Sequence, residues 1–335
     1  MDCPDNLLYT SDDQPGMRRK KWGRGHIYLD VHGKKITSEG AVERIKALAI
    51  PPAWRHVWIC TLPNGHLQAT GMDDKNRKQY LYHPDWVAYR QSAKFDKLYS
   101  FGGHLPQIRS AVARDLRRHH WPREKVAALV VHLMDNYYFR VGQSIYAREN
   151  KSYGVATLRK KHLEIHTDSL DIRYRGKSGK DQRVRITSPP IVRKIRRLSE
   201  LPGYEIFRYE TDKQCKTIEA TDINRYLKEI TATSVTAKDF RTWGGSKLAI
   251  AGYEEVIAEL AEKPQRKFET TLVRKVAHAL GNTVSVCKEY YIHPQVLETL
   301  NQHYNRQDES LGLSDSDDGD EVEEYLMALL RPEKL

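Results

Sequence analysis

Apolar residues in the last third of the chain recur at the spacing of an amphipathic helix. They occupy positions i, i+3, i+4 and i+7, namely Val273, Val276, Ala277 and Leu280. This stripe predicts a helix with one buried face. Gly281 stands where such a helix would need a left-handed residue at its end, and Asn282 or Thr283 can cap a second, short helix.

Two adjacent tyrosines, Tyr290 and Tyr291, follow on that short segment. Pro294 comes next and suits the first turn of another helix. The pair is thus carried between two breaks, where a side chain can be presented instead of buried. Taken alone, the tyrosines are more simply explained as core or surface aromatics, and a reactive phenol would need partners from elsewhere in the chain.

Short alternating runs separated by turn residues dominate residues 21–88. Three of these runs have the alternation of half-buried strands: 27–31, 57–61 and 67–71. The last two flank Pro63-Asn64-Gly65, which is a strong hairpin signal. We therefore predict a small β-rich N-terminal domain over residues 21–88, preceded by a flexible arm over residues 1–20.

The spacing of apolar residues becomes helical after this domain. Three segments carry apolar residues three and four positions apart: 87–98, 105–119 and 123–139. We predict a larger, mainly helical domain over residues 89–306, with a hinge between the two domains at residues 84–94. The fold class expected from both patterns is α+β.

A strand-like pattern interrupts the helical domain after His162. Alternating residues at 170–174 and 184–186 flank a Gly-rich turn that contains Lys177, which predicts a β-hairpin with Lys177 at or near its tip. A lysine at such a tip is commonly only solvated. It can also swing into a site once a substrate binds.

The charge distribution narrows the class of partner. The chain of 335 residues carries a net charge of +11, yet nine acidic and no basic residues lie between Asp308 and Glu324, so the remainder carries +20. So basic a body suggests a polyanionic partner. Charge that serves solubility alone is usually balanced in sign, so we favour nucleic acid. We predict that residues 307–335 form an acidic tail, disordered or a linker, with a possible short helix at 325–330.

Other compositional signals exclude several classes of protein. No run approaches the ~20 apolar residues that a membrane helix needs, and the first residues lack the apolar segment of a secretion signal. The four cysteines show no C-x-x-C pairing, so neither a metal site nor a disulfide framework is predicted. We expect a cytoplasmic, nucleoid-associated protein without a membrane partner.

Cations, aromatics and a glutamine alternate in residues 73–84. Lysine and arginine can bind phosphates, glutamine can read a base edge, and tyrosine can bond phosphate or pack on sugar. A loop followed by an edge strand would give the same residues, but we favour DNA contact. The candidate DNA-binding residues, two of them further along the chain, are Lys75, Arg77, Gln79, Tyr80, Tyr82, Tyr153 and Lys238.

Two arginines stand in apolar company. Arg140 lies between Phe139 and Val141, and Arg241 lies among Phe240 and Trp243. Each is either paired with a buried carboxylate or aimed at an anion. Two such arginines, a lysine at a hairpin tip and a displayed tyrosine would together suit a phosphodiester.

These segments together resemble the type IB DNA topoisomerases, and most closely the compact poxvirus-like branch found in bacteria. The resemblance rests on Arg140-Val141-Gly142, Gly176-Lys177-Ser178-Gly179, Lys238-Asp239-Phe240-Arg241-Thr242-Trp243 and the stretch from Leu280 to Tyr291. Residues 50–54 and 77–84 are similar to the small domain of that branch. The resemblance covers residues 20–305 and implies a monomer whose β-rich and helical domains clamp a DNA duplex.

The resemblance also implies roles for individual residues. Tyr291 would be the nucleophile, Arg140 and Arg241 would hold the non-bridging oxygens of the scissile phosphate, and Lys177 would protonate the leaving 5′ oxygen. Tyr291 is preferred to its neighbour because it lies nine residues beyond Asn282, which is the spacing of the family.

Asn282 departs from the family pattern, which often has histidine at this position. An asparagine cannot donate a proton at neutral pH, so only a hydrogen bond to a phosphate oxygen is expected of it. Whether Asn282 caps the following helix, binds phosphate or does both stays open at this stage.

The implied activity is ATP-independent relaxation of supercoiled DNA through a 3′-phosphotyrosyl intermediate. The chain has no G-x-x-x-x-G-K-[ST] motif, and we expect no cofactor and no required metal. The alternatives are a tyrosine recombinase or integrase and a non-catalytic DNA-binding clamp. Lys238, where recombinases usually carry histidine, and the β-rich N-terminal domain favour the topoisomerase.

Overall fold

The computed structural model describes residues 3–212, 214–313 and 320–332. The chain forms two compact units that divide between Phe95 and Asp96. Within the described residues, no helix combines the length and the apolar character that crossing a bilayer requires.

The first unit is built on an antiparallel five-stranded sheet with the order β2-β1-β3-β4-β5. The strands are β1 (Met17–Trp22), β2 (Gly25–Leu29), β3 (Arg55–Ile59), β4 (Leu67–Met72) and β5 (Lys78–Tyr82). Helix α1 (Glu39–Ala47) lies between β2 and β3 in the chain and buries Ile45 in a small apolar core with Val57, Ile59 and Ala69. The predicted hairpin of β3 and β4 is confirmed, with Ile59 opposite Ala69.

The prediction of a flexible arm over residues 1–20 is wrong for its described part. Leu7 is buried, Leu8 donates its N–H to the Asn64 carbonyl at 2.9 Å, and Tyr9 stacks on His66 with ring centroids 4.2 Å apart. The basic residues 18–21, at the end of the predicted arm, lie within strand β1. Apolar and aromatic side chains in this segment therefore outweigh its polar composition.

Helix α2 (Pro84–Asp115) corrects one further prediction. The sequence predicted separate helices over 87–98 and 105–119, whereas one helix runs through both segments and contains Pro106. The hinge at 84–94 stays a prediction, and the division between the two units, after Phe95, follows it directly. Gly102, which lies between the two predicted segments, is required by packing, because any Cβ there would collide with Met327 and Trp243. A residue that weakens a helix locally is needed for close packing.

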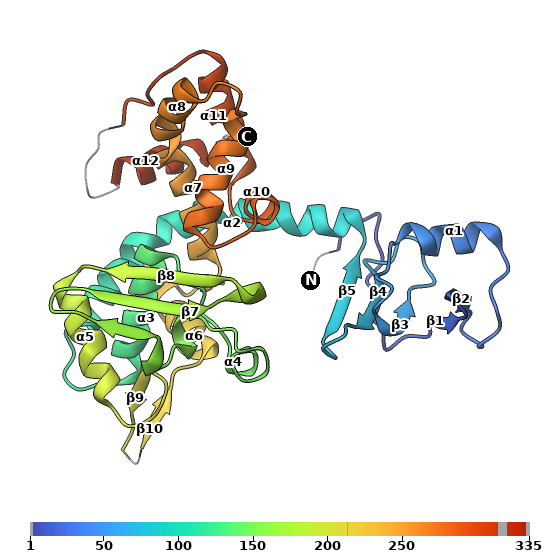
Figure 1. Cartoon of the computed structure of the whole chain (residues 1–335), viewed down its shortest axis with the longest axis horizontal. Helices are drawn as coiled ribbons and strands as arrows, with labels where there is room; N and C mark the ends of the chain where they lie inside the picture. The colour runs from blue at the N-terminus through green and yellow to red at the C-terminus, as the bar shows by residue number, and fades with distance from the viewer. Residues whose placement is uncertain (1–2, 213, 314–319, 333–335) are drawn as a thin grey trace. The chain divides into compact units, whose positions relative to one another are not determined.

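The second unit is mainly helical and surrounds the buried helix α3 (Arg123–Tyr137). Its other helices are α4 (Ser144–Asn150), α5 (Pro189–Glu200), α6 (Ala220–Thr231), α7 (Asp239–Ala251), α8 (Tyr253–Glu262), α9 (Phe268–Ala279), α10 (Val284–Tyr290), α11 (Pro294–Asn305) and α12 (Asp320–Leu329). Figure 1 shows α7, α8, α9, α11 and α12 grouped at one end of this unit. The predicted α+β fold class, with a β-rich first part and a larger helical part, is confirmed.

A three-stranded antiparallel sheet interrupts the helices of the second unit. It has the order β6-β7-β8, with β6 (Leu163–Ile165), β7 (Leu170–Arg175) and β8 (Asp181–Ile186). Figure 1 shows these strands near α3 and α5. The hairpin predicted around Lys177 is therefore confirmed, and a separate hairpin is formed by β9 (Arg208–Glu210) and β10 (Cys215–Thr217).

The C-terminal part is more ordered than its composition predicted. Residues 314–319, in the middle of the acidic stretch, lie outside the described residues. Before them, the Asp308 carbonyl accepts a hydrogen bond from the Tyr253 hydroxyl at 2.6 Å. The predicted short helix is confirmed as α12, which contacts α7 and α11 and buries Leu326 completely.

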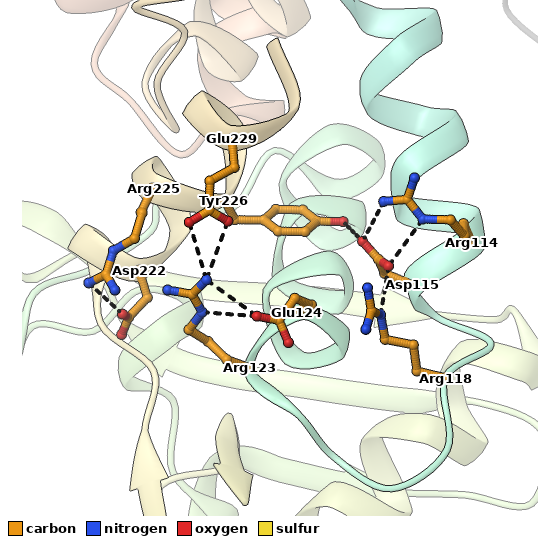
Figure 2. A network of polar contacts seen from close by, with 9 residues as sticks. All are labelled: Arg114, Asp115, Arg118, Arg123, Glu124, Asp222, Arg225, Tyr226 and Glu229. Atoms are coloured by element: carbon orange, nitrogen blue, oxygen red, sulfur yellow. Dashed lines mark hydrogen bonds and ion pairs between the residues drawn. The ribbon is translucent and has the colours of Figure 1, made fainter. Parts of the chain in front are cut away.

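A buried carboxylate joins α2 to α6 in the second unit (Figure 2). Asp115 accepts hydrogen bonds from the Tyr226 hydroxyl at 2.9 Å, from Arg118 Nε at 2.7 Å and from Arg114 Nη2 at 3.2 Å. Burial alone would raise the pKa of Asp115, but these bonds hold it below its usual value. Burial and the bond to Asp115 raise the pKa of Tyr226.

We expect Asp115→Ala to lower the free energy of unfolding by about 3 kcal/mol at pH 7, because it leaves a buried hydroxyl and two arginines without their acceptor. Urea denaturation measures this, with Asp168→Ala, an exposed site, as the matched control. The folded-state pKa is lowered, so the contribution is complete above pH ~4 and is lost as the pH falls through the folded value. A change below ~0.5 kcal/mol would show that the network is not stabilising.

Candidate active site

Arg140 is held at the end of α3 by a close approach of two backbone segments. Val155 and Ala156 donate their N–H groups to the carbonyls of Arg140 and Val141, both at 2.8 Å. A Cβ at Gly154 would collide with the Arg140 carbonyl, and Gly142 has a φ of +81°. The glycines near Arg140 therefore permit the contact that fixes its backbone.

Arg241 lies in the first turn of α7 and is 4% exposed. Its guanidinium donates to the carbonyls of Tyr138 and Leu280, the latter at 2.7 Å. Burial, and then the charge of Arg140, lower the pKa of Arg241 to about 10. Arg140 itself donates to the Gly281 carbonyl at 3.3 Å and to the Asn282 side chain.

Neither arginine forms an ion pair with a carboxylate of the described residues. Arg140 and Arg241 contact carbonyl and amide oxygens instead. A buried guanidinium without a counter-charge is costly unless an anion binds it. Of the two interpretations open from the sequence, the geometry favours an anion site.

The chain leaves α9 through a Schellman motif. Gly281 has a φ of +60° and donates its N–H to the His278 carbonyl at 3.0 Å, and Asn282 donates its N–H to the Ala277 carbonyl at 2.8 Å. Both bonds satisfy carbonyls that the helix end leaves open. The loop that precedes α10 is therefore fixed by backbone hydrogen bonds.

Thr283, not Asn282, caps α10. Thr283 Oγ1 accepts the hydrogen bond of the Val286 N–H at 3.4 Å. The Asn282 Oδ1 instead accepts from Arg140. Of the roles that the sequence left open for Asn282, helix capping is therefore excluded, because Thr283 is the cap.

Tyr291 ends α10 beside Arg241. The guanidinium carbon of Arg241 lies 5.0 Å from the centroid of the Tyr291 ring. Gly245 makes this proximity possible, since any Cβ there would collide with the Tyr291 carbonyl. Helix α7 therefore supplies both the cation beside the Tyr291 phenol, Arg241, and the glycine that leaves room for the Tyr291 backbone, Gly245.

The charges around Tyr291 favour its phenolate. Burial alone would raise the pKa of the Tyr291 phenol, but the positive charges of Arg241 and Arg140, a hydrogen bond with Arg241 and the charge of Lys177 lower it below the usual value. A phenol of ordinary pKa ~10 is a poor nucleophile at neutral pH. A lowered pKa therefore suits Tyr291 to nucleophilic attack.

Lys177 stands in the tight turn between β7 and β8 and is exposed. The sequence did not single out Lys180, whose Nζ donates to the Asn282 carbonyl at 2.7 Å. This bond connects the β7–β8 hairpin to the loop before α10, the helix that leads to Tyr291. The contact was not predictable from spacing because it joins residues 102 positions apart.

Three buried donors at this site have no hydrogen-bond partner among the described residues: Arg140 Nε, Arg241 Nε and Asn282 Nδ2. Arg241 and Asn282 also line a cavity of about 620 Å³, together with Tyr174 and Lys180. Buried donors nearly always have an acceptor. Three such donors together are suited to the oxygens of a phosphate.

The DNA-binding candidates of the first unit lie on and before the edge strand β5. Tyr80 and Tyr82 are exposed on one face, with ring centroids 6.1 Å apart. Arg77 Nε and Gln79 Nε2 instead donate to Asp73, at 2.7 and 3.0 Å, and Arg77 lowers the pKa of Asp73 to about 2. Lys75, which precedes the strand, is exposed, and DNA contact stays a prediction for this segment.

The two candidates of the second unit differ in exposure. Lys238 is exposed at the start of α7, whereas Tyr153 is only 8% exposed and packs edge-on against His162 at 4.5 Å. Tyr153 lines a hollow of about 580 Å³ whose exposed cations the sequence did not single out: Lys151, Lys161, Arg173, Arg175 and Arg183. These cations are better placed for phosphate contacts than the buried ring.

One group of possible metal ligands is present among the described residues. Glu164, His166 and Asp171 bring ligand atoms within 4.8 Å of one another. Arg173 lies 3.0 Å from Glu164, and Arg183 lies 3.7 Å from Asp171. We assign the group to ion pairing, because adjacent guanidiniums already balance its charge.

Two family models match the chain. The catalytic core of eukaryotic DNA topoisomerase I matches residues 78–314, and the N-terminal domain of bacterial DNA topoisomerase IB matches residues 25–73. DNA topoisomerase 1B of Acanthamoeba polyphaga mimivirus is 32% identical over 295 residues, covering 84% of this chain and 87% of that protein. DNA topoisomerase 1B of Vaccinia virus (strain Copenhagen) is 22% identical over 233 residues, covering 69% and 71%.

Proposed function

The chain belongs to the type IB DNA topoisomerase family, and we propose that Tyr291 is the nucleophile with which it cleaves and reseals one strand of duplex DNA. The observation that carries this assignment is the buried guanidinium of Arg241, which lies 5.0 Å from the Tyr291 ring and donates to the carbonyls of Tyr138 and Leu280. A cation placed in this way stabilises both a phenolate and the phosphate that it attacks.

In the cleavage step, the Tyr291 oxygen forms a bond to phosphorus and the bond from phosphorus to the 5′ oxygen breaks. The phenol proton passes to solvent, and Lys177 gives a proton to the leaving 5′ oxygen. Arg140 and Arg241 hold the non-bridging oxygens with donors that stay charged throughout. The reverse steps reseal the strand after the free 5′ end has rotated.

Asn282 completes the phosphate site. Its Oδ1 accepts from Arg140, and its buried amide nitrogen has no acceptor within the part of the chain that the structure describes. We assign this nitrogen to a non-bridging phosphate oxygen. The same side chain thereby orients Arg140 and contacts the substrate, with no part in proton transfer.

No energy source or metal ion is needed in this scheme. The 3′-phosphotyrosyl bond conserves the free energy of the phosphodiester, and preorganised guanidiniums supply the positive charge that metals supply in other phosphoryl transfers. Type IB topoisomerases are generally independent of ATP and metals. We propose the same independence for this chain.

We further propose that the protein acts as a monomer that clamps duplex DNA, in the cytoplasm at the nucleoid. The basic charge of the body and the cations around the hollow near Tyr153 support a DNA surface. The family does not favour the alternatives of a recombinase or of a non-catalytic clamp.

Plasmid relaxation tests this function directly. Supercoiled plasmid is incubated with the protein without ATP, with and without EDTA. We expect a ladder of relaxed topoisomers in both conditions. Recombinant products would indicate a recombinase, retention without relaxation would indicate a binding clamp, and loss of activity in EDTA would overturn metal independence.

DNA affinity should fall steeply with salt. Each phosphate contact contributes a slope of about −0.9 to the plot of log affinity against log salt concentration, and we expect a slope of roughly −5 or steeper for duplex DNA. Fluorescence anisotropy with the Tyr291→Phe variant measures binding without cleavage. A flat dependence between 50 and 200 mM salt would contradict a clamp built on phosphate contacts.

A further inference from the structure

The C-terminal helix α12 packs into the core of the second unit, although it lies beyond residue 314, where the match to the topoisomerase core ends. Leu326 is fully buried, and Met327 lies against Gly102 of α2. Helix α12 contacts α7 and α11 and belongs to the second unit. Helix α12 therefore packs against α7, the helix that carries Arg241.

Glu323 of α12 is the polar centre of this contact. Its two carboxylate oxygens accept from the two terminal nitrogens of Arg109, each at 2.8 Å. Lys247 Nζ donates to the same carboxylate at 2.8 Å, and Trp243 Nε1 lies 3.4 Å from it. Burial alone would raise the pKa of Glu323, but Arg109 and Lys247 lower it to about 2.

Arg109 continues the connection to the end of α3. It donates from Nε and Nη2 to the carboxylate of Asp135, at 2.8 and 3.1 Å. Asp135 lies in the last turn of α3, just before Tyr138, whose carbonyl accepts from Arg241. The Glu323 cluster is thus formed by Glu323, Arg109, Asp135, Trp243 and Lys247.

This cluster joins α7, which carries Arg241, to the end of α3, which shortly precedes Arg140. Trp243 and Lys247 follow Arg241 on α7, and Asp135 precedes Arg140 at the end of α3. The two elements also meet where the ring of Tyr138 fills the space that a Cβ at Gly244 would need. A movement of α7 against α3 would therefore shift both guanidiniums.

We propose that Glu323 is a positioning residue for DNA cleavage: it clamps α7 to the end of α3 through Arg109 and Lys247 and so fixes Arg241 and Arg140 around Tyr291. The inference rests on the proposed function of that site. It assigns a role in the reaction to the C-terminal helix, whose Glu323 lies outside the matched topoisomerase core and contacts Arg109 and Lys247 within it.

Glu323→Gln is the most selective variant, because the amide keeps the shape and one acceptor but loses the charge that Arg109 and Lys247 share. Glu324→Gln makes the same change at an exposed position of the same helix and is the matched control. Both are compared with wild type in single-turnover cleavage of a duplex that releases its 5′ fragment, at saturating protein, with DNA affinity measured separately.

We expect Glu323→Gln to slow cleavage by about 10- to 100-fold, since a misplacement of ~1 Å can cost 10²-fold. Its DNA affinity should stay within about twofold of wild type. The pH–rate profile should move to higher pH, because a less well placed Arg241 lowers the pKa of Tyr291 less. Glu323→Asp should recover part of the rate, and Glu324→Gln should match wild type.

Two results would overturn the proposal. One is cleavage by Glu323→Gln at the wild-type rate. The other is a slower rate with an unchanged pH profile that follows only the folded fraction measured by circular dichroism, which would assign Glu323 to stability alone. The wild type is the separate control for the proposed function: if it does not cleave this duplex, the function itself fails.

Discussion

Tyr291→Phe is expected to abolish cleavage and relaxation, with a loss of at least about 10⁵-fold, the scale on which removal of a catalytic nucleophile is felt. The change deletes only the phenolic oxygen, so no bond to phosphorus can form. The ring still fills its place over Arg241. DNA affinity should therefore change by less than a few fold.

Tyr290→Phe is the matched control, because it makes the same change one residue earlier, on α10 itself. It should cleave within a few fold of wild type. Single-turnover cleavage of a labelled duplex, resolved on denaturing gels, measures both variants. Comparable cleavage by Tyr291→Phe and wild type would show that another residue attacks the phosphate.

Arg241→Lys should slow cleavage by roughly 10³-fold or more, comparable to the loss of an arginine that stabilises a phosphoryl-transfer transition state. The substitution keeps the positive charge. A lysine cannot bond the carbonyls of Tyr138 and Leu280 and a phosphate oxygen in the fixed geometry of a guanidinium. A slower cleavage rate would thus show that the geometry of the guanidinium matters, and not its charge alone.

The same single-turnover assay, with DNA affinity and the free energy of unfolding measured alongside, tests this expectation. Arg274→Lys, at an exposed position of α9, should leave the rate unchanged. The rate of Arg241→Lys should also continue to rise to higher pH, because the Tyr291 phenolate loses part of its stabilisation. A rate within tenfold of wild type would remove Arg241 from the phosphate site.

Local patterns predicted the parts of the site that depend on short segments. The helix end at Gly281, the hairpin around Lys177 and the α+β fold class follow from spacing and turn residues. The two arginines were notable because each stood in apolar surroundings. Their common purpose came from the resemblance to a family, since nothing in the spacing brings Arg140 and Arg241 together.

Long-range packing decided what local patterns could not. The spacing of apolar residues predicted separate helices over 87–98 and 105–119, but α2 is continuous, and close contacts with Met327 and Trp243 leave no room for a Cβ at Gly102. The sequence offers Asn282 and Thr283 equally as caps. In the structure Asn282 Oδ1 accepts from Arg140, and Thr283 caps α10.

The C-terminal segment shows the same limit. Its acidic composition predicted a tail, and the docking of α12 depends on partners that are distant in sequence, among them Arg109 for Glu323. Charge density along the chain indicates solvation only when no opposite charge lies nearby in the fold. The pairing partners of an acidic residue cannot be read from its neighbours in the sequence.

Mapping the covalent intermediate identifies the residue that attacks the phosphate. Protein trapped on a duplex that releases its 5′ fragment is digested with trypsin, and the DNA-linked peptide is sequenced by mass spectrometry. Tyr290 and Tyr291 lie on the same peptide after Lys288, so fragmentation must separate them. We predict a 3′-phosphate joined to Tyr291. A phosphate on Tyr290, on another residue or on none would show that Tyr291 is not the nucleophile.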